Sequence, residues 1–275
     1  MSALADTQEG LDALRRLLAA HPRLFVLTGA GISTASGIPD YRDRDGGWKR
    51  TPPVTLQAFV GDAATRSRYW ARSLVGWRRF GTAEPNDAHA ALARLEHAGH
   101  VVQLLTQNVD GLHQAAGSRA VVDLHGRLDR VRCLGCERRT TRTDFQRVLE
   151  RRNPDWVALD ALDAPDGDAD LEGLPFDRFV VPACEVCGGL LKPDVVFFGE
   201  AVPRERVEHA FAALERSDAM LVVGSSLMVY SGFRFARAAA QAGKPVAAIN
   251  LGRTRADGLL SLKIEADCVA TLRAF

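Results

Sequence analysis

The chain has 275 residues, of which 47% are hydrophobic and 25% are charged, and its formal net charge is +1. This length is enough for one large domain, or for one with a smaller insert, around a buried core. A nearly neutral chain has no overall attraction for nucleic acid or for a membrane surface, and no apolar run reaches the length of a transmembrane helix. The first residues lack the basic and apolar segments of a secretion signal, so we expect a cytoplasmic protein.

The first elements are a helix and a buried strand. Residues 8–20 place leucines on one helical face, and Pro22 ends that helix. Residues 24–27 are a short apolar run, which favours a buried parallel strand. Gly29 and Gly31 follow at once, and they allow the backbone to turn sharply and to approach a ligand closely.

This glycine turn is compatible with nucleotide binding. A strand, a glycine turn and a helix start are the usual means by which α/β sheets hold a dinucleotide, with backbone N–H groups facing the pyrophosphate. The common fingerprint has its third glycine where this chain has Thr34, and the next glycine is Gly37. A tight turn without a ligand has a similar sequence, so this segment alone leaves both interpretations open.

The following residues lack a clear period. Residues 43–53 are polar and contain glycine, which predicts a loop. Residues 56–80 are rich in aromatic and basic side chains, and we expect short helices packed over that loop. Tyr69 and Arg72 share a helix face at this spacing, and the simplest interpretation is a packed aromatic ring beside a surface arginine. Residues 85–98 predict another helix.

Polar residues gather after the next predicted strand. Residues 100–105 read as a buried strand and run into TQNVDGLH, which lies at the sheet edge where open α/β sheets bind ligands. A short apolar stretch, residues 121–124, leads to His125. By residue type alone, Asn108 and Asp110 could merely cap a helix beginning near residue 111, and His125 could be an ordinary loop histidine.

Residues 129–190 differ in character from the rest. Arginines crowd residues 127–152, and an acidic stretch with proline and glycine follows. Two C-x-x-C pairs bracket this region, and they consist of Cys133, Cys136, Cys184 and Cys187. Four thiolates at this spacing predict a closed, tetrahedral structural zinc site in an inserted module. A redox dithiol and unligated cysteines are the alternatives.

The remaining residues return to an alternation of helices and strands. Residues 190–200 predict a strand or loop edge, and helices are expected at 204–216 and 233–241. The predicted strands at 218–223 and 245–249 end in GSS and NLG, just as the first strand ends in GAG. Three strands that end in small, polar turns favour an α/β fold that binds a nucleotide.

The order of the motifs makes the prediction specific. GAGIS, GIPDYR, TQNVDGLH, LHG, the paired C-x-x-C, KPDVVFFGE, GSS and NLG occur in the order found in sirtuins, the Sir2 family of NAD-dependent protein-lysine deacylases. The resemblance covers the chain from about residue 20 to its end. DYR, RYWAR, APDGD and VVFFGE are similar to class II sirtuins, especially the mitochondrial lipoamidase and ADP-ribosyltransferase branch and its bacterial relatives.

The resemblance implies a domain organisation. It assigns residues 1–42, 85–128 and 190–275 to a Rossmann-like NAD-binding domain with a parallel sheet. Residues 43–84 would form a cofactor-binding loop and helical insert. Residues 129–189 would form a small zinc-binding module with a long loop.

The resemblance also implies site residues. His125, with a near-neutral pKa, would be the general base, and Asn108 would join it in catalysis. Val196 and Phe198 would line an apolar channel for the acyl-lysine. The residues implied to contact NAD are Gly29, Ala30, Gly31, Ile32, Ser33, Pro39, Asp40, Tyr41, Arg42, Gln107, Asn108, Val109, Asp110, Gly224, Ser225, Ser226, Asn250, Leu251, Gly252 and Cys268.

The implied reaction consumes NAD and an acyl-lysine protein or peptide, and it releases nicotinamide, free lysine and O-acyl-ADP-ribose. Acid-selective sirtuins bind a carboxylated acyl group with a Tyr and an Arg at the spacing of Tyr69 and Arg72. Residues 163–173 could also shape the acyl channel, so acetyl, lipoyl, longer and dicarboxyl groups all stay open. The sequence leaves the oligomeric state undetermined, and a monomer is compatible with it.

Three other functions are to be weighed. One is mono-ADP-ribosyl transfer to a protein, which would use the same activated ribose. Another is a zinc-ribbon nucleic-acid binder that uses the arginines of residues 127–152, although charge runs are usually solvated faces. The last is a catalytically silent sensor of NAD or ADP-ribose.

Overall fold

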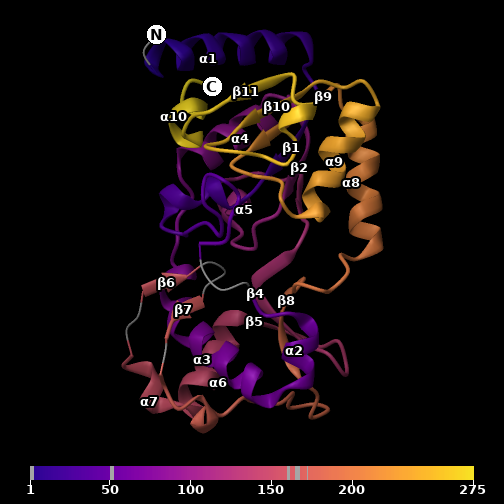
Figure 1. The fold of residues 1–275 in the computed structure, drawn as a ribbon. Helices are drawn as coiled ribbons and strands as arrows, with labels where there is room; N and C mark the ends of the chain where they lie inside the picture. Colours follow the sequence, from indigo (N-terminus) through magenta and orange to yellow (C-terminus); the bar gives the residue numbers. More distant parts are fainter. Residues whose placement is uncertain (1–2, 50–52, 160–161, 165–167, 172) are drawn as a thin grey trace.

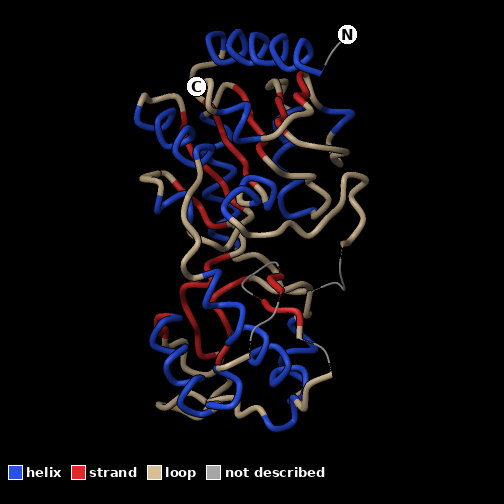
Figure 2. The backbone as a smooth tube through the Cα atoms, turned by 90° about the vertical axis from the view of Figure 1, so that its left-hand side faces the viewer, coloured by secondary structure: helices blue, strands red, loops and turns tan. Residues whose placement is uncertain are grey.

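The computed structural model describes residues 3–49, 53–159, 162–164, 168–171 and 173–275. The chain forms two parts, stacked one above the other in Figure 1, and the larger part contains both termini. Figure 2 shows the same two parts from the side, with the N-terminal helix across the end farthest from the smaller part. No helix among the described residues is both long enough and apolar enough to span a membrane.

A six-stranded parallel sheet forms the centre of the larger part. Its strands lie in the order β11-β10-β9-β1-β2-β3, and every neighbouring pair is parallel. In chain order the strands are β1 (Leu24–Thr28), β2 (Val101–Thr106), β3 (Val121–Asp123), β9 (Ala219–Val223), β10 (Val246–Ile249) and β11 (Leu262–Ile264). The Rossmann-like α/β fold expected from the sequence is therefore confirmed.

Helices cover both faces of this sheet. Leu24 and Val26 of β1 join one hydrophobic cluster, whereas Phe25 and Leu27 join another on the opposite face. This alternation follows from the two-residue period of a strand. Burial on both faces explains why the strand is apolar at every one of these positions. The covering helices are α1 (Ala3–Ala20), α4 (Asp87–His97) and α10 (Cys268–Leu272) on one face, and α8 (Arg204–Arg216) and α9 (Tyr230–Gln241) on the other.

The smaller part contains a three-stranded antiparallel sheet in the order β5-β4-β8. Its strands are β4 (Gly126–Cys133), β5 (Arg139–Thr141) and β8 (Leu191–Val195), and a separate hairpin pairs β6 (Leu162–Ala164) with β7 (Asp168–Asp170). The α-helices that the structure describes in this part are α2 (Leu56–Gly61), α3 (Ala63–Phe80), α6 (Arg142–Arg152) and α7 (Pro154–Val157). A third hydrophobic cluster, which includes Trp70 and Phe145, holds the helices and the sheet together.

Some expected elements differ from the structure. Residues 63–80 form one continuous helix, α3, where short helices were expected, because Asp62 caps its first turn and Trp70 and Leu74 anchor its buried face. Helix α9 begins at Tyr230, three residues before the expected start. Of the 163–173 segment, residues 165–167 and 172 lie outside the described residues, as do 50–52 of the predicted 43–53 loop.

Further short elements connect these. Within the described residues, the other helical turns are η1 (Ala30–Ile32), η2 (Thr34–Ser36), α5 (Leu112–Ala115), η4 (Phe176–Arg178) and η5 (Asp257–Leu259). The turns η1, η2 and α5 all follow the carboxyl ends of β1 and β2, which are adjacent in the sheet. The segments that carry most of the predicted site residues therefore begin at the carboxyl ends of the parallel strands.

Candidate active site

The glycine turn after β1 lies against the turn after β9. Gly31 N–H donates to the carbonyl oxygen of Gly224 at 2.8 Å. A Cβ added at Gly29 would lie 2.7 Å from Ser225 Cβ, and one added at Gly31 would lie 2.9 Å from the Gly224 oxygen. Both positions therefore require glycine for this close approach. The turn continues as the short 3-10 turns η1 and η2 and not as the regular helix start that was expected.

Asn108 and Ser33 bind the two neighbouring strand ends together. The side-chain amide of Asn108 donates to the carbonyl oxygen of Gly29 at 3.1 Å and to Ser33 Oγ at 3.0 Å. Ser33 Oγ donates in turn to Asp110 Oδ2 at 2.8 Å. The second carboxylate oxygen of Asp110 accepts from Leu112 N–H at 2.9 Å. Asp110 therefore accepts from the first N–H of α5 and also from Ser33, whereas Asn108 binds the glycine turn.

Two buried histidines lie next to Ser33 and to the end of β1. His89 Nε2 lies 3.5 Å from Ser33 Oγ, and His113 Nε2 lies 2.9 Å from Thr28 Oγ1. Burial lowers the pKa of His89 to about 4. Burial, together with the neighbouring His89, also lowers the pKa of His113 well below its ordinary value. Both rings are therefore neutral at neutral pH and act as supports of the site.

His125 follows β3 and precedes β4, and both of its ring nitrogens have partners. Nδ1 lies 2.9 Å from the carbonyl oxygen of Gln107, and Nε2 lies 2.8 Å from Ser231 Oγ. Removal from water lowers the pKa of His125 to about 4, which is below the near-neutral value expected from the sequence. The imidazole is therefore uncharged at neutral pH and can accept a proton.

Gln107 connects His125 to the turn after β9. Its backbone N–H donates to the carbonyl oxygen of Thr28 at 2.9 Å, and its side-chain oxygen accepts from Ser225 Oγ at 2.6 Å. The peptide that holds His125 is thus fixed by hydrogen bonds to two other strand ends. The glycine turn, the residues after β2 and His125 consequently form one connected group.

The turn after β10 follows a strand that is next to β9 and two strands away from β1 in the sheet. Asn250 is buried, and its side-chain amide donates to the carbonyl oxygen of Leu251 at 2.9 Å. Gly252 N–H donates to Glu265 at 3.2 Å. Cys268 is buried at the start of α10, and burial raises the pKa of its thiol to about 12. This thiol is therefore a protonated packing group and not a reactive thiolate.

Arg42 turns toward its own loop. Its guanidinium donates to the carbonyl oxygen of Gly46 at 2.7 Å and lies 3.9 Å from the centre of the Trp48 ring. Trp48 also meets the edge of Tyr41, and its ring centre is 5.7 Å from that of Phe198. These contacts join the loop after Pro39 to the segment that carries the two expected channel residues, Val196 and Phe198.

Val196 and Phe198 follow β8. The N–H of Val196 donates to the carbonyl oxygen of His125 at 2.7 Å, so the predicted channel segment runs directly beside the predicted base. Phe198 is among the few large apolar side chains that remain exposed in the described part of the chain. An exposed aromatic ring beside a polar site is suitable for contact with a ligand.

Tyr69 and Arg72 have different environments although they share α3. The Tyr69 ring lies 5.3 Å from that of Phe59 and 5.3 Å from that of Phe197, and burial raises its pKa. Arg72 Nε donates to Asp168 Oδ1 of β7 at 3.0 Å. The arginine therefore already carries a carboxylate partner from the hairpin.

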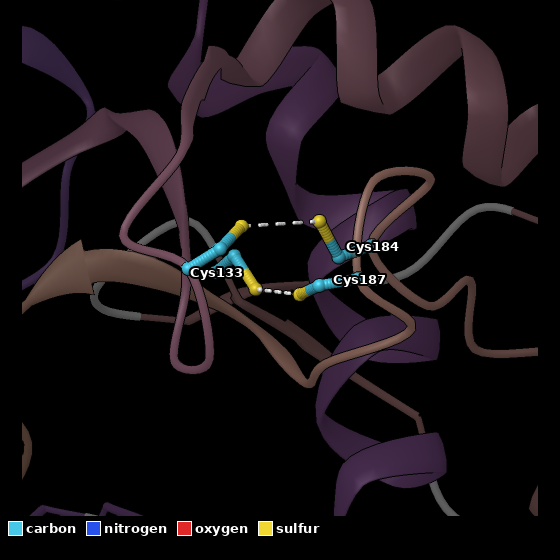
Figure 3. A group of neighbouring side chains, drawn as sticks. Cys133, Cys184 and Cys187 are labelled. Carbon is cyan, nitrogen blue, oxygen red and sulfur yellow. Dashed lines mark hydrogen bonds between the residues drawn. The ribbon is translucent and has the colours of Figure 1, made fainter.

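The four paired cysteines form a compact group in the smaller part. Their sulfur atoms all lie within 4.8 Å of one another, and Cys133 Sγ is 3.4 Å from Cys187 Sγ (Figure 3). Four thiolates at such distances fit a tetrahedral zinc ion with no position left for a substrate. Cys133 ends the eight-residue β4, whose first residue follows His125, and such a strand spans about 23 Å. This group therefore stabilises structure and lies away from the predicted base.

The chain is similar in sequence and in structure to known proteins. Residues 29–231 match the model of the Sir2 family. The NAD-dependent protein deacetylase of Xanthomonas campestris pv. campestris (strain 8004) is 68% identical over 269 residues, which cover 98% of this chain and 92% of that protein. The NAD-dependent protein deacetylase 2 of Bradyrhizobium diazoefficiens is 67% identical over 261 residues, which cover 95% of this chain and 96% of that protein. A solved structure described as "Sir2-p53 peptide-NAD+" has a TM-score of 0.75 and 30% identity, with 96% of each chain covered.

Proposed function

The chain belongs to the Sir2 family, and from this premise we propose that it is an NAD-dependent protein-lysine deacetylase. It would release nicotinamide, free lysine and O-acyl-ADP-ribose. The observation that supports this most strongly is the connected group at the sheet edge, in which Gly29, Asn108 and Gln107 link the glycine turn to His125. That group combines a close-approach backbone turn, amide and carboxylate side chains, and an uncharged base.

The residues at this edge fit NAD. Gly29 and Gly31 let the turn after β1 pack closely on Gly224 and Ser225. The backbone N–H groups of this turn would bind the pyrophosphate, with Ser225 and Ser226 on its other side. Asn250 would contact the adenosine ribose. The remaining NAD contacts that we propose are those assigned by resemblance, namely Ala30, Ile32, Ser33, Pro39, Asp40, Tyr41, Arg42, Val109, Gly224, Leu251, Gly252 and Cys268.

The residues after β2 would bind the reacting end of NAD. When bound, NAD supplies a ribose carbon whose bond to nicotinamide can be exchanged for a bond to the acyl oxygen of the substrate. The Asp110 carboxylate, held by Ser33, would accept a hydrogen bond from the carboxamide of nicotinamide. Asn108, held by the carbonyl oxygen of Gly29, would orient the ribose. Both side chains are preorganised, so little ordering is required on binding.

His125 would act as the general base. Its Nε2 would take a proton from a ribose hydroxyl group, while Nδ1 stays bound to the carbonyl oxygen of Gln107. Val196 and Phe198 would line the channel for the acyl-lysine. An apolar channel favours a neutral amide over a charged amine, because burial of a charge without a partner is unfavourable.

The acyl group would be neutral. Tyr69 packs on Phe197, which stands between Val196 and Phe198, so α3 borders the proposed channel. Asp168 supplies Arg72 with a carboxylate, so the charge of the arginine is already matched. A dicarboxyl acyl group would have to compete with Asp168 for Arg72 and would be repelled by its carboxylate, whereas acetyl and lipoyl groups would do neither. The DYR, RYWAR, APDGD and VVFFGE motifs support the proposed assignment to the class II branch.

The smaller part would serve as a structural module. Zinc held by the four cysteines would join the turn after β4 to the turn before β8. The domain boundaries proposed from the sequence assign residues 129–189 to this module and residues 43–84 to the loop and helical insert. A reducing cytoplasm would keep these thiols available for metal, which supports a cytoplasmic location.

The arginines of residues 127–152 support an enzyme more than a nucleic-acid binder. Arg142 is buried against Trp70 and Trp77. Arg127 pairs with Asp129 at 2.6 Å, and Arg139 pairs with Asp194 at 2.9 Å. Much of the positive charge in this run is therefore buried or matched by carboxylates.

The test is a panel of acyl-lysine peptides incubated with NAD, with the products identified by mass spectrometry beside His125→Tyr. Free lysine and O-acyl-ADP-ribose, lost in the variant, are expected. Transfer of ADP-ribose to protein without release of lysine would favour the transferase instead. NAD binding without nicotinamide release would indicate a sensor, and salt-dependent DNA binding that survives His125→Ala would indicate a nucleic-acid binder.

A further inference from the structure

Ser231 contacts the proposed base although no sequence motif indicated it. It is the second residue of α9, and its Oγ lies 2.8 Å from His125 Nε2 across a sequence separation of 106 residues. Nε2 is the nitrogen that the proposed reaction needs. The hydroxyl group of Ser231 therefore occupies the position from which a substrate hydroxyl would deliver its proton.

The partners of the imidazole determine the direction of each hydrogen bond. The carbonyl oxygen of Gln107 can only accept, so Nδ1 carries the hydrogen and donates it at 2.9 Å. In the neutral ring the other nitrogen then has a lone pair. The Ser231 O–H group must therefore donate to this lone pair. A ring with its hydrogen on Nδ1 and a lone pair on Nε2 is the tautomer that a general base at Nε2 requires.

The first turn of α9 is held close to the base by a second contact. A Cβ added at Gly232 would lie 2.6 Å from Gln107 Nε2 and 2.8 Å from its Cδ. Glycine at this position therefore allows the helix to pack against the residue whose carbonyl group binds His125. Ser231 thus contacts Nε2 of His125, and Gly232 packs on Gln107, whose carbonyl oxygen binds Nδ1 of the same ring.

We propose that Ser231 is a positioning residue that holds His125 in its Nδ1–H tautomer and keeps Nε2 directed toward the site until a substrate hydroxyl group replaces the serine. This inference rests on the proposed deacetylase reaction for its last step. Its first part, the tautomer, concerns the protein without substrate. The two parts can therefore be tested separately.

The charges around the ring act in the same direction as Ser231. Arg206 of α8 donates to the carbonyl oxygen of Leu124 at 2.9 Å, and Arg234 of α9 donates to that of Ser231 at 3.1 Å. Both guanidinium groups disfavour a charged imidazole, whereas the Gln107 carbonyl favours it. Burial disfavours the charged form of Arg206, whereas the carboxylates of Asp123 and Asp194 favour it. A donor to the lone pair stabilises the neutral ring further.

The experiment compares Ser231→Ala, Ser231→Thr and the wild type in the pH dependence of kcat/KM. In Ser231→Ala the loss of one hydrogen bond should raise the midpoint of the acid limb by about half to one pH unit. The kcat of this variant should be reduced, while its KM for the peptide is unchanged. Threonine restores the wild-type profile. The control is Tyr230→Phe, which removes a surface hydroxyl bound to Arg237 from the same turn and leaves the profile unchanged.

A ¹⁵N NMR titration of histidine in the ligand-free wild type completes the test, with His125 identified by its absence in His125→Gln. A hydrogen on Nδ1 and a lone pair on Nε2 support the proposal even if Ser231→Ala does not fold. A hydrogen on Nε2, or profiles of wild type and Ser231→Ala that coincide, would overturn it. A wild type that forms the expected tautomer but releases no nicotinamide would instead refute the deacetylase function.

Discussion

Ser33 Oγ donates a hydrogen bond of 2.8 Å to Asp110 Oδ2, and this bond joins two segments that are 77 residues apart in the chain. Ser33 lies just past η1, whereas Asp110 follows β2, the neighbouring strand. Asn108 donates to the same serine oxygen at 3.0 Å. The shape of the glycine turn and the position of the carboxylate are therefore set by the same small group of contacts.

Asp110→Asn tests the charge at this position. An asparagine has the same size and can still accept from Ser33, so the fold should persist. Hydrogen bonds to charged groups contribute about 1.5–3 kcal/mol, so we expect kcat/KM for NAD to fall roughly 10- to 100-fold. Steady-state kinetics with varied NAD measures this effect. Asp12→Asn, on the exposed face of α1, is the matched control, and equal losses in both variants would argue against a role of Asp110 in the site.

Gly31→Ala tests the close approach of the two turns. The new Cβ would lie 2.9 Å from the Gly224 oxygen and 3.0 Å from its Cα, and both are backbone atoms that cannot move aside easily. We expect at least a 10-fold weaker affinity for NAD and a lower melting temperature, because overpacking of this kind costs about 1–3 kcal/mol. Gly258→Ala is the control, because nothing lies within 4 Å of its added Cβ. Calorimetric titration with NAD would show whether the two variants differ as expected.

Three histidines with lowered pKa values predict a loss of stability in mild acid. The pKa values of His89 and His125 are lowered to about 4 by removal from water, and that of His113 is also lowered well below its ordinary value. Between about pH 6.5 and pH 4 the unfolded chain therefore binds more protons than the folded one, so the free energy of unfolding falls as the pH falls. Each of these rings contributes roughly 1–3 kcal/mol to this loss.

Urea unfolding at several pH values measures this dependence. His125→Gln should reduce the slope between pH 6.5 and pH 4, since one of the lowered groups is removed. His97→Gln, at an exposed position near the end of α4, should leave the slope unchanged. A free energy of unfolding that is constant across this range would contradict the prediction.

Continuous apolar runs made the central strands predictable. Residues 24–27 and 219–223 contain no polar side chain, so burial on both faces of a parallel sheet was the natural interpretation, and the structure confirms it. The helix at 204–216 was also predicted correctly, because its apolar residues follow the helical period. Here local pattern and tertiary structure agree.

Long-range partners could not be predicted in the same way. Ser231 has no local signal, and its importance depends on His125, which lies 106 residues earlier in the chain. Arg72 and Asp168 are separated by 96 residues, and nothing in either neighbourhood indicates the other. The lowered pKa of His125 likewise results from burial, which residue type alone does not reveal.

Cys184→Ser tests the zinc module. Three remaining thiolates cannot close a tetrahedral site, so we expect less than one zinc per chain, lower solubility and a lower melting temperature. Metal content after dialysis, measured by mass spectrometry, gives the direct readout. Cys268→Ser should retain its zinc, because that cysteine is buried at α10 and is outside the cluster. Full zinc occupancy in Cys184→Ser would show that the four sulfur atoms do not act together.

Asp168→Asn tests the proposed preference for a neutral acyl group. The Asp168 carboxylate is bound to Arg72 at 3.0 Å, and burial raises its pKa although the arginine acts in the opposite direction. Asparagine keeps the size and a hydrogen-bond acceptor but removes the negative charge that would repel a dicarboxyl acyl group. We expect the ratio of kcat/KM for succinyl-lysine to that for acetyl-lysine peptide to rise by about 10-fold, in keeping with about 1.4 kcal/mol for one removed charge contact.

Glu208→Gln removes an exposed charge on α8 that pairs with Arg204, and it should leave the ratio as it is in the wild type. If Asp168→Asn also left the ratio unchanged, the hairpin charge would have no part in acyl selection, and the preference would have to arise from the shape of the Val196 and Phe198 segment alone.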